Sequence, residues 1–158
     1  GLEKNNEIIC GIIYDPIKDE MFTAEKGNGS YLNNQRMRVS SRSKLKDCII
    51  FTGGPKPESK DREIALKEYN NEKNKTKKNI KIRNFGSAAL DMAYVGAGRL
   101  DGFFEKNLNI WDIAAGIIII KEAGGIINDI DINKNKNIKV LASSSSINEK
   151  FAQNLLNF

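Results

Sequence analysis

The chain has 158 residues, of which 40% are hydrophobic and 28% charged, a balance typical of a globular domain with a core of its own. It contains no histidine, which excludes a Ser-His-Asp triad, a Cys-His pair and a histidine-ligated zinc within these residues. The formal net charge of +5 suggests anionic partners only weakly, because lysine is abundant along the whole chain and builds no single basic site.

The first forty residues are predicted to form an antiparallel meander. Its strands and hairpin turn are expected at IICGIIY (8–14), MFTAE (21–25), KGNGS (26–30), SYLNN (30–34) and MRVS (37–40). Asp15-Pro16 breaks the first strand, and we interpret the two carboxylates around Pro16 as part of a turn rather than a metal loop. A meander this short has difficulty covering both of its faces, so one interpretation is that it finishes a sheet whose other strands lie upstream of Gly1.

From residue 46 onward, predicted strands alternate with predicted helices, which indicates an α/β layer. We expect strands at 48–54, 81–85, 100–105, 126–130 and 139–144, and helices at 59–73, 87–97, 113–123 and 149–156. The second of these helices carries Leu90, Ala93, Tyr94 and Ala97 on one face, and Gly98 marks its end. We therefore expect two subdomains: residues 1–45 as the end of a first antiparallel sheet, and residues 46–158 as a C-terminal α/β subdomain.

Both cysteines are isolated and lie beside apolar residues. Cys10 and Cys48 are therefore expected to be small core residues of a cytoplasmic protein in a reducing compartment. The longest apolar run, residues 113–120, is too short to span a bilayer, which requires about 20 residues. We expect no membrane partner.

Polar residues and glycines gather where predicted strands run into helices. These junctions contain Gly53-Gly54, Gly86-Ser87, and Glu105 followed by Trp111-Asp112. In α/β sheets, ligands bind beyond the carboxyl ends of the strands. Helix N-termini at that edge favour anions such as phosphate, because they present free N–H groups and the positive end of the helix dipole.

Each of these residues also has an ordinary structural explanation. Asp112 would only cap its helix, Glu105 would be an exposed strand end, and Gly86-Ser87 would be a common turn and cap. The remaining features are expected to be structural. Trp111 is expected in the core, and Lys121 and Glu122 at the solvated edge of a helix. The lysine-rich residues 70–84 are expected to form a solvated loop, because they lack the interleaved aromatic residues of a nucleic-acid surface.

Three segments together resemble one known family. The last of them resembles the C-terminal signature of the inositol monophosphatase family. It consists of WDIAAG at residues 111–116, an apolar helix and then AGG at 123–125. Residues 86–105, GSAALDMAYVGAGRLDGFFE, and residues 11–40 are similar to the segments that precede this signature. The resemblance implies an α/β fold, the C-terminal part of the family's α/β/α/β/α layered sandwich. It also implies a magnesium-dependent phosphomonoesterase acting on inositol 1-phosphate or a related polyol or sugar phosphate.

The resemblance also implies roles for individual residues. Asp112 would be a ligand of the second Mg²⁺ and would touch the substrate, and Glu105 would hydrogen-bond substrate hydroxyls. Gly86, Ser87 and Ala88 would line the substrate pocket. Magnesium prefers oxygen ligands, and two such ions can activate water and clamp a phosphoryl group without any histidine. In this interpretation the apolar helix holds Asp112 rigidly, and Trp111 packs beneath it.

Two of the family's motifs do not occur in this sequence. D-P-x-D-G-[ST] and G-E-E supply most of the metal ligands, and in the family both precede the segment that matches residue 8. We therefore expect a truncated chain that is inactive alone and binds magnesium negligibly, with no catalytic residue beyond the metal ligand Asp112.

A second hypothesis is a non-catalytic binding module for RNA or the transcription machinery. Some bacterial family members associate with RNA polymerase and antitermination factors, and a basic surface attracts nucleic acid through phosphate contacts. Family members are often dimers, so a homodimer is a further expectation that rests on the resemblance alone.

Overall fold

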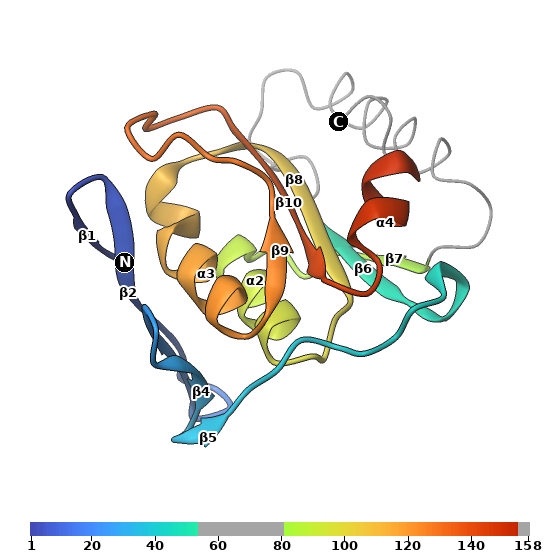
Figure 1. The fold of residues 1–158 in the computed structure, drawn as a ribbon, viewed down its shortest axis with the longest axis horizontal. Helices are drawn as coiled ribbons and strands as arrows, with labels where there is room; N and C mark the ends of the chain where they lie inside the picture. Colours follow the sequence, from blue (N-terminus) through green and yellow to red (C-terminus); the bar gives the residue numbers. More distant parts are fainter. Residues whose placement is uncertain (54–80, 155–158) are drawn as a thin grey trace.

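A computed structural model of the chain describes residues 1–53 and 81–154. Two five-stranded sheets enclose a pair of helices, α2 and α3, and a further helix, α4, lies on the outer side of the second sheet (Figure 1). This layered, mixed α/β arrangement confirms the expected fold class. The predicted helix at 59–73 and most of the lysine-rich segment fall outside the described residues. None of the described helices is long and apolar enough to cross a membrane.

The first sheet is the predicted antiparallel meander. Its strands, in spatial and chain order, are β1 (Leu2–Lys4), β2 (Glu7–Asp15), β3 (Glu20–Glu25), β4 (Gly29–Leu32) and β5 (Gln35–Arg36). The prediction missed β1, and it was wrong for residues 37–40, which are not a strand. The Val39 N–H instead donates to the Ala123 carbonyl (3.1 Å), so this segment crosses from the meander to the end of α3.

The second sheet is mixed. Its strands in spatial order are β7 (Lys81–Arg83), β6 (Ile49–Thr52), β8 (Gly102–Leu108), β10 (Ile138–Ser144) and β9 (Gly125–Ile127). Strand β6 pairs in parallel with both β7 and β8, whereas β10 is antiparallel to β8 and to β9. The predicted strands therefore exist, with shifted ends.

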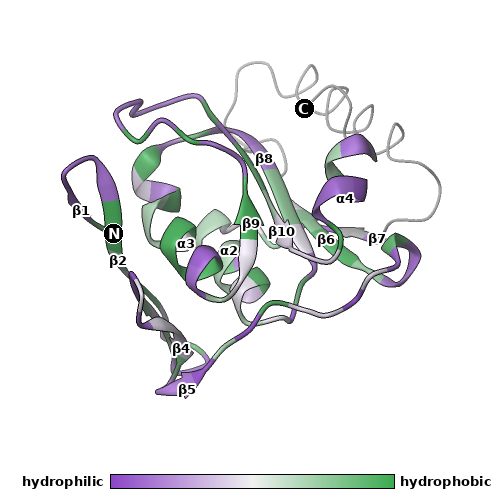
Figure 2. Cartoon of the chain, viewed as in Figure 1, coloured by the Kyte–Doolittle hydropathy of each residue, from purple (hydrophilic) through white to green (hydrophobic). Residues whose placement is uncertain are grey.

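The two central helices are α2 (Ala88–Gly96) and α3 (Ile110–Glu122); α4 spans Asn148–Asn154, and a short 3₁₀ turn, η1, spans Leu45–Asp47. The four residues expected on one apolar face of α2, Leu90, Ala93, Tyr94 and Ala97, all pack in or against the core, and burial extends around the helix, since every residue from Asp91 to Gly96 is buried. Helix α3 is hydrophobic over most of its length (Figure 2). An elongated apolar helix without a polar face is stable only when it is covered on several sides, as α3 is here.

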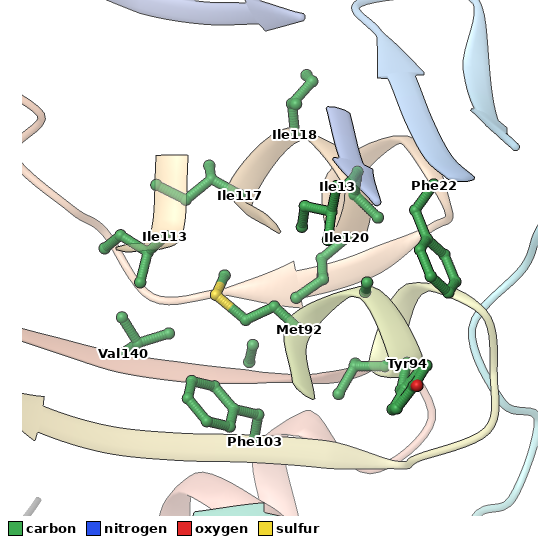
Figure 3. Close-up of a cluster of buried hydrophobic side chains, with 14 of the residues drawn as sticks. Ile13, Phe22, Met92, Tyr94, Phe103, Ile113, Ile117, Ile118, Ile120 and Val140 are labelled. Atoms are coloured by element: carbon green, nitrogen blue, oxygen red, sulfur yellow. The ribbon is translucent and has the colours of Figure 1, made fainter. Parts of the chain in front are cut away.

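Glycines allow α2 and α3 to approach each other closely. A Cβ at Gly116 of α3 would lie 2.7 Å from the Met92 Cβ of α2, and one at Gly96 would lie 2.8 Å from the Ile119 Cγ2. Figure 3 shows Met92 between the isoleucines of α3 and Phe103 of β8. Met92 and Phe103 are fully buried, so this helix pair forms the centre of the main core.

A carboxylate at the end of α3 fastens the meander to the helix layer. Glu122 accepts hydrogen bonds, both at 2.9 Å, from the backbone N–H of Gly27 in the turn after β3 and from that of Gly29, the first residue of β4. The expectation that Glu122 is merely solvated was therefore wrong, since its two oxygens hold a hairpin distant in sequence. Lys121 is exposed, as predicted.

The two cysteines are free thiols with different surroundings. Cys48 is fully buried, as predicted, and burial raises the pKa of its thiol to about 11. Cys10 is only half-buried, because it pairs with Leu2 and Glu25 on the outward face of the meander rather than in the core.

Candidate functional site

Parallel pairing brings the three strand-to-helix junctions to one edge of the second sheet. Phe51 of β6 is paired with Arg83 of β7 on one side and with Phe103 of β8 on the other. Parallel strands end at the same edge, so the segments that follow β6 and β7 lie level with the second half of β8. Helices α2 and α3 both begin after this edge and pack against each other.

Glu105 lies directly over the backbone of Gly53. A Cβ added to Gly53 would come within 1.9 Å of the Glu105 carboxyl carbon, so a larger residue at position 53 requires this carboxylate to move. Glu105 is half-buried and stands inside β8, three residues before the strand ends, so it is not an exposed strand end. The sequence marked Gly53 as a junction glycine, but its contact with Glu105 depends on cross-strand pairing and was missed.

Gly86, Ser87 and Ala88 form the start of α2. Gly86 has φ of +83°, a left-handed conformation that favours glycine, and open space lies where its side chain would be. Ser87 is the N-cap, and its Oγ accepts a hydrogen bond from the Leu90 N–H (3.4 Å). The turn-and-cap interpretation is therefore confirmed, and it leaves the Gly86 backbone exposed at the sheet edge.

Asp112 is in the first turn of α3, because the helix begins at Ile110, three residues earlier than expected. Its Oδ2 accepts hydrogen bonds from the backbone N–H (3.2 Å) and the side-chain amide (3.0 Å) of Asn109, the N-cap residue. The capping role is thus confirmed. Both bonds end on Oδ2, and Oδ1 has none within the described residues, so capping leaves one oxygen for another ligand. Asn109 was missed, although Asn-x-x-Asp is a recognisable capping pattern.

Trp111 is not in the core, and it does not pack beneath Asp112, since 63% of its surface is exposed. It lies one helical turn before Ala114 and Ala115, the residues of α3 against which the meander glycines Gly1 and Gly11 pack. Trp111 therefore lies on the same side of α3 as these two alanines, but beyond the part of the helix that the meander covers. Phe85, directly before Gly86, is also exposed (70%), so an aromatic side chain stands beside two of the three junctions.

The described residues contain part of a metal site at most. Asp112 presents a hard carboxylate oxygen of the kind that magnesium prefers. Among residues 1–53 and 81–154, however, no three or more Asp, Glu, His or Cys side chains are grouped so that they could hold an ion. A single carboxylate does not by itself form a site for Mg²⁺.

Asp91, one turn into α2, was not singled out by its sequence. Its side chain is completely buried, and neither carboxyl oxygen has a hydrogen-bond partner in the described part of the chain. Burial raises the pKa of Asp91 to about 7, because the charged form is costly in an apolar surrounding. No local pattern reveals this, since a single acidic residue in an apolar helix usually faces solvent.

Comparison with known proteins extends this picture. Residues 1–157 match the inositol monophosphatase family. The inositol-1-monophosphatase of Mesorhizobium japonicum is 45% identical over 131 residues, which are 83% of this chain and 48% of that protein. The Nus factor SuhB of Escherichia coli K12 is 44% identical over 118 residues, 75% of this chain and 43% of that protein.

Solved structures agree with the sequence matches. The crystal structure of extragenic suppressor protein suhB from Bartonella henselae superposes with a TM-score of 0.81 at 42% identity, over 94% of this chain and 57% of that chain. The chain spans about half the length of the curated relatives it matches and corresponds to their C-terminal portion. By its sequence and its fold, the chain belongs to the inositol monophosphatase family.

Proposed function

We propose that this chain is the C-terminal portion of a magnesium-dependent phosphomonoesterase that hydrolyses inositol 1-phosphate or a related polyol or sugar phosphate. The observation that carries the proposal is the convergence of Glu105, Asp112 and the N-termini of α2 and α3 at one edge of the second sheet. Two helix N-termini favour a phosphate group, and two carboxylates suit a metal and sugar hydroxyls.

Each residue has a role in this proposal that its position supports. Asp112 binds Mg²⁺ through Oδ1, while its Oδ2 remains bonded to Asn109, so the cap orients the ligand. Glu105, seated over Gly53, accepts hydrogen bonds from substrate hydroxyls. The backbone from Gly86 to Ala88 lines the pocket. When bound, Mg²⁺ would polarise the phosphate and activate water.

The proposal makes the 158 residues insufficient by themselves. Mg²⁺ requires about six oxygen ligands, of which the described residues supply one in this proposal, from Asp112. Isothermal titration of the 158-residue chain with MgCl₂ should therefore show negligible heat, and tight one-to-one binding would contradict this.

Activity is tested in an extended chain. In this extended chain, the N-terminal portion of the B. henselae protein, which has no counterpart here, is joined ahead of Gly1. It should release phosphate from inositol 1-phosphate in the presence of Mg²⁺. Asp112→Asn should lower kcat by about 100-fold or more, since it removes a charged metal ligand. The matched control Asp129→Asn, an exposed carboxylate in the loop after β9, should leave turnover unchanged.

Gly53→Ala probes the role of Glu105 without altering Glu105 itself. The added methyl displaces its carboxylate, so KM for the polyol phosphate should rise by about tenfold, while the thermal unfolding midpoint changes little. Unchanged KM in Gly53→Ala and Glu105→Gln would remove Glu105 from the substrate site.

A second candidate function is a non-catalytic module that binds RNA or the transcription machinery, such as RNA polymerase or antitermination factors. It is supported by the 44% identity to a protein named Nus factor SuhB. The test is RNA binding at several salt concentrations, with a variant in which Lys73, Lys75, Lys77 and Lys78 are replaced by Gln. A steep salt dependence that the variant loses would favour this function. Absent or salt-independent binding would reject it.

A further inference from the structure

The hairpin that joins β3 to β4 contains the only Asn-Gly dipeptide in the sequence, Asn28-Gly29. Asn28 is exposed, whereas Gly29, the first residue of β4, is buried. An asparagine followed by glycine is chemically labile, because glycine has no side chain to hinder the approach of its backbone nitrogen to the asparagine amide carbon. The hairpin therefore places a reactive pair of groups at the surface of the meander.

The reaction open to this pair is deamidation, which needs water and no other reactant. The Gly29 backbone nitrogen gives up its proton and attacks the side-chain amide carbon, Cγ, of Asn28. A C–N bond forms, the side-chain nitrogen leaves as ammonia, and the product is a succinimide ring. Water then cleaves one of the two imide C–N bonds, which leaves aspartate or isoaspartate at position 28. In both products a neutral amide has become a carboxylate.

The structure holds the attacking nitrogen away from this reaction. The Gly29 N–H donates to Glu122 Oε2 (2.9 Å), and the Asn28 carbonyl of the same peptide unit accepts a hydrogen bond from the Tyr31 hydroxyl (3.0 Å). The peptide unit must rotate to bring its nitrogen toward Cγ, and both of its polar groups are bound. The carboxylate of Glu122 also disfavours loss of the N–H proton, because the anion formed would lie beside a negative charge.

A carboxylate at position 28 would alter the charges around the hairpin. It would stand between Gly27 and Gly29, the two residues whose N–H groups bind Glu122, and like charges repel. The Arg36 guanidinium lies against Gly29, since a Cβ at Gly29 would be 3.2 Å from its Nη2. The new carboxylate therefore has a cation to pair with inside the meander and an anion to avoid on α3.

We propose that Asn28-Gly29 is a site of spontaneous deamidation that Glu122 restrains, and that deamidation weakens the contact between the meander and α3. The hairpin must leave Glu122 before the nitrogen can attack, and the product then disfavours its return. The modification is thus a one-way change in how two layers of the fold are held together. It does not depend on the proposed phosphatase function, and its tests use the 158-residue chain.

Mass spectrometry of the chain after incubation in mildly alkaline buffer locates the modification. Trypsin cleaves after Lys26 and Arg36, so it releases residues 27–36, GNGSYLNNQR, as one peptide. This peptide also contains Asn33 and Asn34, which serve as internal references. An acid should accumulate at position 28 before it does at 33 or 34, and equal or slower conversion at position 28 would contradict the assignment of the site.

Glu122→Ala tests the restraint. Conversion of Asn28 should become about tenfold faster, because a hydrogen bond to a charged acceptor no longer has to open first. Conversion of Asn34 should not change, and the matched control Lys121→Ala, an exposed neighbour on α3, should alter neither rate. An unchanged rate at Asn28 would remove the restraint, and a slower one would make Glu122 a base for the cyclisation. Equal acceleration at Asn28 and Asn34 would mean general unfolding, and the proposal would again be wrong.

Asn28→Asp tests the consequence, because it installs the product carboxylate directly. Amide hydrogen exchange measured by NMR should be about tenfold faster at Gly27 and Gly29 than in the original chain. Asn34→Asp adds the same charge at an exposed position in the next turn and should leave both amides unchanged. Unchanged exchange in Asn28→Asp would refute the weakened contact, and equal acceleration in Asn34→Asp would show that position 28 has no particular effect.

Discussion

Replacing Asp91 by Asn should change how the stability of the 158-residue chain depends on pH. The folded state raises the pKa of Asp91 from 3.8 to about 7, so the folded protein holds this proton more tightly than the unfolded chain does. The associated stability is complete below pH 3.8 and is lost as the pH rises toward 7. A difference of about three pKa units corresponds to about 4 kcal/mol, an upper value because buried sites relax and admit water.

Asn is neutral at every pH and has nearly the shape of protonated Asp. Asp91→Asn should therefore unfold with about the same free energy as the original chain near pH 4, and should be more stable by up to about 4 kcal/mol at pH 8. Other carboxylates, such as Glu20 beside Arg99, have lowered pKa values and act in the opposite direction. They are common to both proteins, so the difference between the two isolates Asp91.

The measurement is urea unfolding followed by circular dichroism at several pH values between 4 and 8. A difference between the two proteins that stays constant across this range would refute the reasoning. It would mean that Asp91 is charged in the folded state, with a partner or water that stabilises the carboxylate.

Three further predictions concern packing and exposure. Glu122→Gln should destabilise the chain by about 1–2 kcal/mol in urea unfolding, because an amide has one acceptor oxygen for the two hairpin N–H groups; an unchanged midpoint would show that the contact is not formed. Gly116→Ala should cost about 1–3 kcal/mol, since its methyl meets the Met92 Cβ, which is fixed to the backbone. Gly96→Ala is the matched control and should cost less, because its methyl closely approaches one side-chain methyl, Ile119 Cγ2 at 2.8 Å, whereas the methyl at position 116 meets Cβ, Sδ and Cε of Met92 within 2.9 Å. Acrylamide should quench the fluorescence of the single tryptophan, Trp111, efficiently in the 158-residue chain, and weak quenching would restore the core interpretation.

Part of the candidate site could be predicted because its parts are local. The turn at Gly86, the cap at Ser87 and the apolar helix after Asp112 each depend on residues within a few positions of one another. Alternation of strands and helices then implied that these junctions share a sheet edge. The length of α3 was underestimated, because its N-cap, Asn109, stands before the apolar run that marked the helix.

The sequence by itself determined the order and type of most elements, since hydrophobic periodicity, turn glycines and capping residues act over short distances. Only the tertiary structure decided which side chains meet. Glu105 lies over Gly53 because β6 and β8 are neighbours, and Glu122 binds a hairpin more than ninety residues away in sequence. Burial of individual side chains could not be predicted either, since Trp111 is exposed although it is apolar and Asp91 is buried although it is acidic. Burial depends on what the other layers of the fold cover, which no local pattern contains.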